Sequence, residues 1–421
     1  MRILMTNQDT TLFRRFLETH TNPELLVCLF VVCFLVFGCH KEMPRQSPVE
    51  QAQPDPEKAV ETVSMEIIRA IEDAGGKIER DAKGVVAGVN LAAERTSVTN
   101  AVLRQALLIP NLKNLAVAGG SLSYEAFSGL AKQQHLETLF LQDVPLTDSD
   151  LEAMVASVPT LRRLTLRRLN KVGEPGITAA LETVPLQSLA LIEMSPTRVV
   201  IEKIAGSPDL RALDLRQCSN LTQEDYRILG TMTRLADLKI GGFAVDDSVL
   251  EILPGLPQLR GLSIEGTSIT GEGFAELASH EEWAAQLELL VLARNTAIYD
   301  AGLDSLRAFR GLKRLAVSDM MVTGVFFHAL AETETIRTRL ESLSFPKTYL
   351  TAQNMRVLNQ FPNLKKLDLS HNMLTPDILE AIAELKTVEQ LNLTGCQLDD
   401  TALETVRKMQ SLKVLTTNSQ Q

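Results

Sequence analysis

The chain has 421 residues and a formal net charge of −10, with 22% of its residues charged and 5% aromatic. This mildly acidic balance argues against nonspecific binding to nucleic acid, whose phosphates attract basic surfaces. The low aromatic content also disfavours a surface on which nucleobases stack. Composition therefore predicts that nucleic acid is not a partner.

Residues 1–38 have the features of an export signal. Leu25 to Phe37 is a run of thirteen apolar residues, which is short for a transmembrane helix and suits the apolar part of a signal peptide. The run leads into Gly38 and Cys39, a sequence that resembles a bacterial lipobox, in which the cysteine is lipidated and becomes the new N-terminus. We expect a lipoprotein-type signal peptide with Cys39 as the lipidation site. The alternative is an uncleaved membrane anchor, and both interpretations place the rest of the chain outside the cytoplasm.

Two short segments follow the signal. Residues 39–56 are rich in Pro and Gln and contain no large apolar run, as in a flexible tether. Residues 57–84 begin with an apolar stripe at helical spacing and pass through Gly75 and Gly76, which are typical of a helix end. This segment therefore predicts a cap helix and the start of a hairpin.

From residue 85 to residue 421, the phrase Leu-x-x-Leu-x-Leu returns at steps of 24 to 28 residues. A degenerate first copy begins at Val86. The other copies begin at Leu112, Leu136, Leu161, Leu186, Leu210, Leu235, Leu259, Leu287, Leu312, Leu340, Leu364, Val388 and Leu412. A fixed period in this range is typical of a solenoid, here with about 14 units.

Each unit begins as a strand and continues through a turn into a short helix. In the unit from Leu210, Leu213 and Leu215 alternate with Asp214, which is strand periodicity. Thr222 then precedes acidic residues, as at the start of a helix. Because successive strands lie about 24 residues apart, they need a crossover and should run parallel. One unit buries too little apolar surface to fold alone, so stacked units must share their apolar faces.

These units resemble leucine-rich repeats, whose general pattern is L-x-x-L-x-L-x-x-N/C-x-L. LKKLDLSHNML, from Leu364, and VEQLNLTGCQL, from Val388, carry Asn372 and Cys396 at the ninth position. The resemblance implies that these two residues face inward and hydrogen-bond the turn. It also implies an α/β fold, a right-handed leucine-rich-repeat solenoid or horseshoe with a parallel inner sheet and short helices on its convex side.

Two further features extend this resemblance, and one feature departs from it. The units from Leu259 and Leu312 are 28 residues long, and they resemble the ribonuclease-inhibitor type, with an extra helical turn. Residues 57–92 resemble the entry cap of secreted bacterial leucine-rich-repeat proteins. At the ninth position several units depart from the pattern, so we expect an incomplete ladder of polar turn residues: Gly120, Val144, Met194 and Phe243.

The five cysteines do not predict a disulfide framework. Cys28 and Cys33 lie in the apolar run, and Cys39 is the lipidation candidate. Cys218 and Cys396 share the ninth repeat position seven units apart, which places them roughly 34 Å from each other. Because a disulfide requires Cα atoms within about 7 Å, we expect two buried thiols.

No set of residues predicts catalysis. The six histidines do not pair at metal-ligand spacing. Carboxylates such as Asp148, Asp150, Asp246 and Asp247 fall at helix starts, where the helix dipole favours them. We expect no enzymatic activity, no metal and no cofactor.

The inner sheet is the better candidate site. Residues 161–169 read LRRLTLRRL, and Arg216 follows two units later. We hypothesise that Arg163, Arg167 and Arg216 contact an acidic or glycan-like partner, because guanidinium groups suit carboxylates. The alternative is a solvated face on which Asp214 and nearby acids neutralise the arginines. The candidate partner-binding residues, which include an apolar pair, are Phe140, Arg163, Arg167, Ile192, Asp214, Arg216 and Lys239.

The sequence thus predicts a non-enzymatic binding scaffold, an exported lipoprotein of the cell envelope that recognises a protein or polysaccharide partner through its concave sheet. A membrane contact would come from the N-terminal lipid or an uncleaved anchor. The alternative is a structural envelope protein that acts by self-association. A third interpretation, an intracellular adaptor similar to the repeat half of ubiquitin-ligase receptors, would need a helical docking domain, for which residues 40–84 are too short.

Overall fold

The computed structural model describes residues 64–93, 96–119 and 121–417. The chain divides into Met1–Thr62 and Val63–Gln421, and the fold below is that of the second unit. The expected signal, Cys39 and tether lie outside the described residues. No helix in the described ranges is long and apolar enough to cross a membrane.

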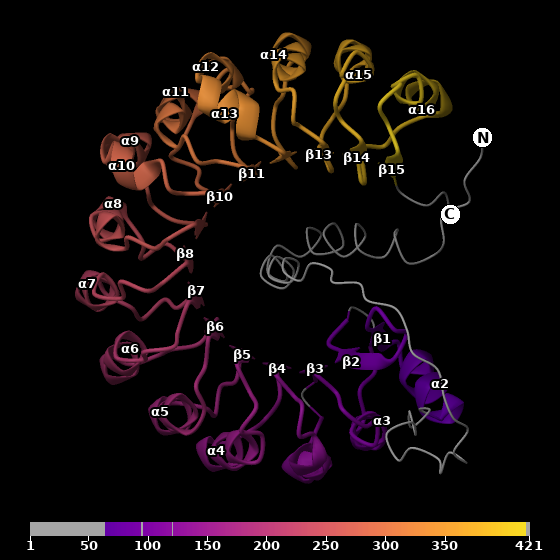
Figure 1. The fold of residues 1–421 in the computed structure, drawn as a ribbon, viewed down its shortest axis with the longest axis vertical. Coiled ribbons are helices and arrows are strands. Elements are labelled where there is room, and N and C mark those ends of the chain that lie inside the picture. Colours follow the sequence, from indigo (N-terminus) through magenta and orange to yellow (C-terminus); the bar gives the residue numbers. More distant parts are fainter. Residues whose placement is uncertain (1–63, 94–95, 120, 418–421) are drawn as a thin grey trace, which may run out of the picture. The chain divides into compact units, whose positions relative to one another are not determined.

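The strands form one 15-stranded sheet whose order follows the chain (Figure 1). The first pair, β1 and β2, is the antiparallel hairpin expected after the cap helix, and every later pair is parallel. The predicted parallel sheet is therefore confirmed. The strands are β1 Lys77–Arg80, β2 Val86–Leu91, β3 Asn114–Ala118, β4 Thr138–Gln142, β5 Arg163–Arg167, β6 Ser188–Ile192, β7 Ala212–Arg216, β8 Asp237–Gly241, β9 Gly261–Glu265, β10 Leu289–Ala293, β11 Arg314–Ser318, β12 Ser342–Ser344, β13 Lys366–Asp368, β14 Gln390–Asn392 and β15 Val414–Thr416.

Short helices connect the strands and lie on the outer side of the stack, while the strands line its inner side (Figure 1). Many begin at a Ser, Thr or Asp whose side chain accepts a hydrogen bond from the first turn, as Thr147 and Thr222 do. The α-helices are α2 Met65–Asp73, α3 Asn100–Ala106, α4 Asp148–Ala156, α5 Glu174–Thr183, α6 Arg198–Ala205, α7 Gln223–Leu229, α8 Asp247–Leu250, α9 Gly271–Ser279, α10 Glu281–Ala284, α11 Asp300–Leu303, α12 Phe327–Glu332, α13 Glu334–Arg339, α14 Ala352–Val357, α15 Pro376–Ala383 and α16 Asp400–Val406. The 3-10 helices are η2 Tyr124–Lys132, η3 Leu253–Gly255, η4 Asp304–Ala308 and η5 Leu358–Gln360.

The core is built from the leucines of the repeated phrase. Leu213, Leu238 and Leu262 lie at the same level of β7, β8 and β9, paired strand to strand, and all three are buried. Full burial of each such side chain contributes about 1.5–3 kcal/mol. Because the equivalent leucines of neighbouring units touch, the apolar interior is continuous along the stack.

The ninth position of the repeat stabilises the turns, as the resemblance implied. Asn372 Nδ2 donates to the carbonyl oxygen of Phe345 at 2.6 Å, and Asn372 Oδ1 accepts from the backbone N–H of Thr348 at 2.7 Å. The Cys218 and Cys396 thiols are free and buried, and they donate to carbonyl oxygens of the preceding unit. Burial raises the pKa of Cys218 to about 12 and that of Cys396 to about 11.

Where the ninth residue is apolar, its environment varies from unit to unit. Val144 and Met194 are buried, whereas Phe243 is 85% exposed. The polar ladder is therefore incomplete in the described residues, as the sequence predicted.

The two 28-residue units each contain an additional short helix, which confirms the extra helical turn. The unit from Leu259 holds α9 and α10, and the unit from Leu312 holds α12 and α13. Large aromatic side chains of these units are buried in the core. Phe274 stacks on Phe309 with ring centroids 5.5 Å apart, and the indole N–H of the buried Trp283 donates to the carbonyl oxygen of Leu256 at 3.3 Å.

The residue that follows the repeated strand phrase, at the eighth position, has a positive φ in twelve successive units. Four of the twelve are glycines: Gly119, Gly242, Gly266 and Gly395. The other eight have φ between 51° and 59°, namely Asp143, Arg168, Glu193, Gln217, Arg294, Asp319, Lys347 and His371. A non-glycine residue in this region costs about 1 kcal/mol, and most of these side chains are charged. The eighth position thus brings a row of charged groups to one edge of the inner face.

Candidate binding surface

The inner face of β7 to β10 carries a chain of ion pairs centred on Arg216. Its guanidinium lies 2.9 Å from Asp214 Oδ2 and 2.8 Å from Glu265 Oε2. Glu265 also pairs with Arg294 of the next unit, and Lys239 Nζ lies 3.9 Å from Asp214 Oδ2. The side chains of Asp214, Arg216 and Glu265 are 10%, 10% and 5% exposed, so these charges form a fixed network.

Arg216 reaches Glu265 across an intervening strand, and that strand carries a glycine between them. Arg216, Gly241 and Glu265 are direct register partners on β7, β8 and β9. A Cβ at Gly241 would lie 2.4 Å from the carbonyl oxygen of Glu265 and 3.4 Å from Cγ of Arg216. A side chain at Gly241 would therefore collide with the backbone of Glu265.

The charges in this network also set the pKa of Asp214. Burial alone would raise the pKa of this carboxyl, but the charges of Arg216 and Lys239 outweigh burial and lower it. A carboxyl whose pKa is lower in the folded chain stabilises the fold above its unfolded pKa of about 3.9. That stabilisation is lost as the pH falls from this value through the lower folded pKa.

A second group of charges lies at the edge of β4 to β6 and uses the eighth-position residues. Arg168 binds Asp143 through two hydrogen bonds, each of 2.8 Å. Arg168 and Arg167 both reach Glu193 Oε1, at 2.9 and 2.8 Å. The hydrogen bonds from Arg168 lower the pKa of Asp143, while burial and the neighbouring Arg168 lower the pKa of Arg167. Three successive repeats thus share one ion-paired cluster.

A family model described as a leucine rich repeat matches residues 338–398. A structure of the Rad7 and Elc1 complex in yeast shares the fold, with a TM-score of 0.52 and 16% identity over 75% of this chain and 77% of that chain. The chain is a leucine-rich-repeat protein. An internalin from Listeria monocytogenes gives a TM-score of 0.43 and 19% identity over 78% of this chain and 87% of that chain. No curated protein matched this leucine-rich-repeat chain.

The candidate residues of this leucine-rich-repeat protein differ in how accessible they are. Phe140 and Arg163 are partly exposed, and Arg163 donates to Thr138 Oγ1 at 3.0 Å and to Glu137 Oε2 at 3.4 Å. The other five candidates are buried and come from strands β5 to β8: Arg167, Ile192, Asp214, Arg216 and Lys239. Asp214 pairs with Arg216, which is the neutralisation considered as the alternative from the sequence.

Phe140 and Ile192 do not form one apolar spot. Phe140 is a register partner of Thr165, whereas Ile192 is a register partner of Arg167. The two residues therefore lie at different levels of the sheet with β5 between them. Leucine-rich-repeat scaffolds typically act by binding other proteins on their extended surfaces, and here the partly exposed inner side chains include Phe140 on β4 and Arg163 and Thr165 on β5.

Several members of the two clusters are absent from the candidate residues of the sequence. Glu265 occupies the same repeat position as Arg216, so extending the register to the unit from Leu259 would have found it. Asp143, Arg168 and Glu193 come directly after their strands. The alternation of inward and outward residues holds only within a strand, so it does not predict which way these three side chains point. Their positive φ values decide where they point, and sequence spacing gives no signal for that.

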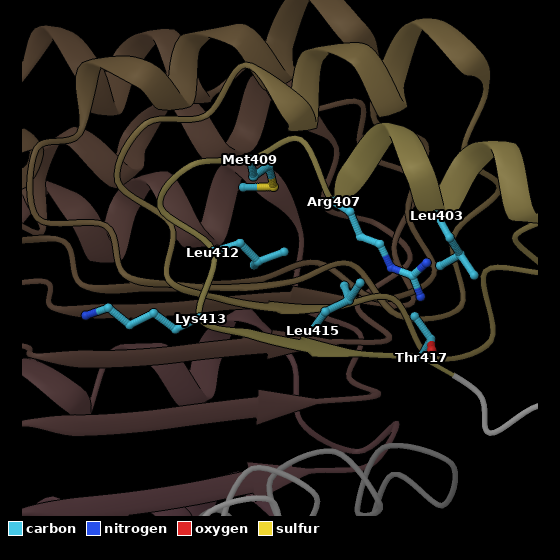
Figure 2. A pocket seen from close by; sticks show the side chains of 7 residues that line it. All are labelled: Leu403, Arg407, Met409, Leu412, Lys413, Leu415 and Thr417. Atoms are coloured by element: carbon cyan, nitrogen blue, oxygen red, sulfur yellow. The ribbon is translucent and has the colours of Figure 1, made fainter. Parts of the chain in front are cut away.

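Shallow recesses interrupt the described surface of this leucine-rich-repeat protein. One, of about 180 Å³, lies beside the second charge cluster and is lined by Asp143, Val144, Pro145, Arg168, Asn170 and Lys171. Another, of about 330 Å³, lies at the last described repeat and is lined by side chains from α16, β15, the turn between them and Thr417 after β15 (Figure 2). Leu412 and Leu415, which line this second recess, are only partly buried. Among the described residues, no group of three His, Cys, Asp or Glu side chains is arranged to hold a metal ion.

Proposed function

We propose that this protein is an exported, lipid-anchored scaffold that binds a protein partner noncovalently through the inner face of its sheet. The observation that carries the proposal is the pair of ion-paired clusters along β4 to β10. Their charges are held by neighbouring charges of opposite sign, and the partly exposed members, Asp143, Arg168 and Glu193, present a fixed pattern to a partner. Fixed charge patterns give an interface specificity and set its register.

The composition of the inner face favours a protein over a polysaccharide. Both signs of charge alternate along the face, as in Asp143, Arg168 and Glu193, and a protein surface can complement both. Phe140 is the aromatic residue among the outward positions of β4 to β10, so the face offers little ring surface on which sugars could stack. Phe140, Arg163 and Thr165 lie together on β4 and β5 and are accessible, which makes them the expected contact residues.

Charge reversal at Arg163 tests the inner face. We expect Arg163→Glu to reduce recovery of the partner from cells at least tenfold, because like charges would then oppose each other at the contact. The matched control is Arg198→Glu, on the outer helix α6, where the arginine side chain is 59% exposed. Quantitative affinity purification of the full chain measures both variants. Equal recovery with Arg163→Glu and with the unmodified chain would contradict binding through this face.

Lipid anchoring is supported by the apolar run Leu25 to Phe37 and by Gly38 and Cys39. We expect Cys39→Ala to move the protein from the membrane fraction to the soluble fraction if a lipid holds it. Cell fractionation with quantitative immunoblotting measures the shift, and Cys218→Ala, which changes a buried repeat thiol, is the control. A Cys39→Ala variant that stays with the membranes would favour an uncleaved anchor instead.

A further inference from the structure

A row of exposed apolar side chains lies on the turns that follow β11, β12 and β13. Met321, Tyr349 and Met373 occupy the tenth position of three consecutive units and are 59%, 65% and 87% exposed. We call these three residues the apolar ladder. Their neighbours at the ninth and eleventh positions are buried or partly buried, so the turn holds each ladder side chain pointing away from the core.

The ladder is a local property of these three units. At the same tenth position, the eight preceding units carry small or polar residues: Ser121, Pro145, Asn170, Ser195, Ser219, Ala244, Ser268 and Thr296. The fold therefore does not require a large apolar side chain at this position. Contiguous exposed apolar surface on a soluble domain is typical of an interaction site.

The three turns are packed against one another, which makes the ladder continuous. The backbone N–H of Tyr349 donates to the carbonyl oxygen of Val322 at 2.9 Å. Asn372 Oδ1 accepts from the backbone N–H of Thr348 at 2.7 Å. Neighbouring strands of a sheet lie about 4.8 Å apart, so successive ladder side chains are separated by about one strand step.

We propose that the apolar ladder docks an amphipathic α-helix of a protein partner, lying along the stack. An α-helix has a pitch of about 5.4 Å, so apolar residues one turn apart recur at nearly the strand step. An extended segment would place same-side residues about 6.6 Å apart and lose register within three units. Helical spacing of three and four residues thus matches the ladder better than strand spacing.

The charged residues beside the apolar ladder favour a partner helix over a second copy of this chain. Lys347, at the eighth position next to Tyr349, is exposed, and Asp319 occupies the eighth position one unit earlier. A partner helix with a carboxylate beside its middle anchor would complement Lys347. A second copy of this chain, docked about a twofold axis at Tyr349, would instead bring Lys347 against its own equivalent, and like charges disfavour that contact.

Photo-crosslinking of the full chain in its own cells tests this proposal. A benzophenone amino acid replaces Tyr349, and the matched control carries it at Ser219, an exposed tenth-position residue of an earlier unit. We expect adducts from position 349 that map to one protein segment with apolar residues at three- and four-residue spacing. Adding Met321→Ser and Met373→Ser should reduce the adduct at least tenfold, while Arg163→Glu should leave it unchanged.

The other outcomes overturn the proposal in distinct ways. Adducts to lipid alone would make the ladder a membrane-contacting surface, and adducts to the same chain would make it a contact between copies. A crosslinked segment without helical apolar spacing would exclude the helix. No adduct above the level of the Ser219 control would mean that the ladder docks nothing. Loss of the adduct with Arg163→Glu would mean that the ladder belongs to the inner-face interface.

Discussion

Replacing Arg216 with methionine is expected to lower the free energy of unfolding by about 3–5 kcal/mol. The substitution keeps a similar apolar volume but leaves Asp214 and Glu265 without the guanidinium that lies 2.9 and 2.8 Å from them. Glu265 keeps Arg294 and Asp214 keeps Lys239 at 3.9 Å, but the lost guanidinium is the closest partner of Asp214, so much of the cost of removing these carboxylates from water is no longer offset. Denaturant unfolding, combined with hydrogen exchange of the β7 to β9 amides, measures both the size and the location of the loss.

The matched control for Arg216→Met is Arg163→Met. Arg163 also lies on the inner face, but its ion pair with Glu137 joins side chains that are 38% and 47% exposed. Exposed pairs contribute about 1 kcal/mol or less, so Arg163→Met should change stability little. Equal, small changes in the free energy of unfolding for the two substitutions would show that the Arg216 cluster is solvated. That result would contradict a fixed arrangement of its charges.

Replacing Phe345 with alanine is expected to cost about 3–5 kcal/mol. Phe345 is fully buried, and its ring centroid lies 4.9 Å from that of Phe327 and 5.9 Å from that of Phe326. The three rings pack where two units meet, because Phe326 and Phe327 belong to the long unit from Leu312 and Phe345 belongs to the next unit. Alanine would leave a cavity that the surrounding strands and helices cannot close.

Phe243→Ala is the control, because it makes the same chemical change at a side chain that is 85% exposed. Surface substitutions of this kind usually change stability by no more than about 0.5 kcal/mol. Thermal and denaturant unfolding of the two variants compare them directly. A loss for Phe345→Ala no larger than that for Phe243→Ala would mean that the aromatic cluster does not hold the long unit together.

The repeated leucines predicted the fold because each unit specifies itself locally. Strand, turn and helix recur within about 24 residues, and stacking adds only neighbours of the same kind. The repeat position also predicted the environment of single turn residues. Asn372 and Cys396 are buried and hydrogen-bonded, as expected for the ninth position. In the C-terminal turns too, the residues on either side of Tyr349 and Met373 are buried or partly buried.

The binding surface was less predictable, because its contacts join units that lie apart in the sequence. The ion pair of Arg216 with Glu265 spans 49 residues and crosses a whole repeat, with Gly241 in the strand between them. Whether Arg168 faces Asp143 depends on a left-handed backbone at both residues. A charged residue in the sequence does not predict that conformation. Sequence spacing therefore located the inner face but did not separate its accessible residues, such as Phe140, from its buried ones.

The most direct measurement is a photo-crosslinking comparison between the two sides of the sheet. A benzophenone amino acid is placed at Thr165, on the inner face of β5, or at Arg198, on the outer helix α6. If the inner face binds a protein, position 165 should give an adduct with that protein, and Arg163→Glu should remove it. An adduct from position 198 with none from position 165 would contradict binding through the inner face.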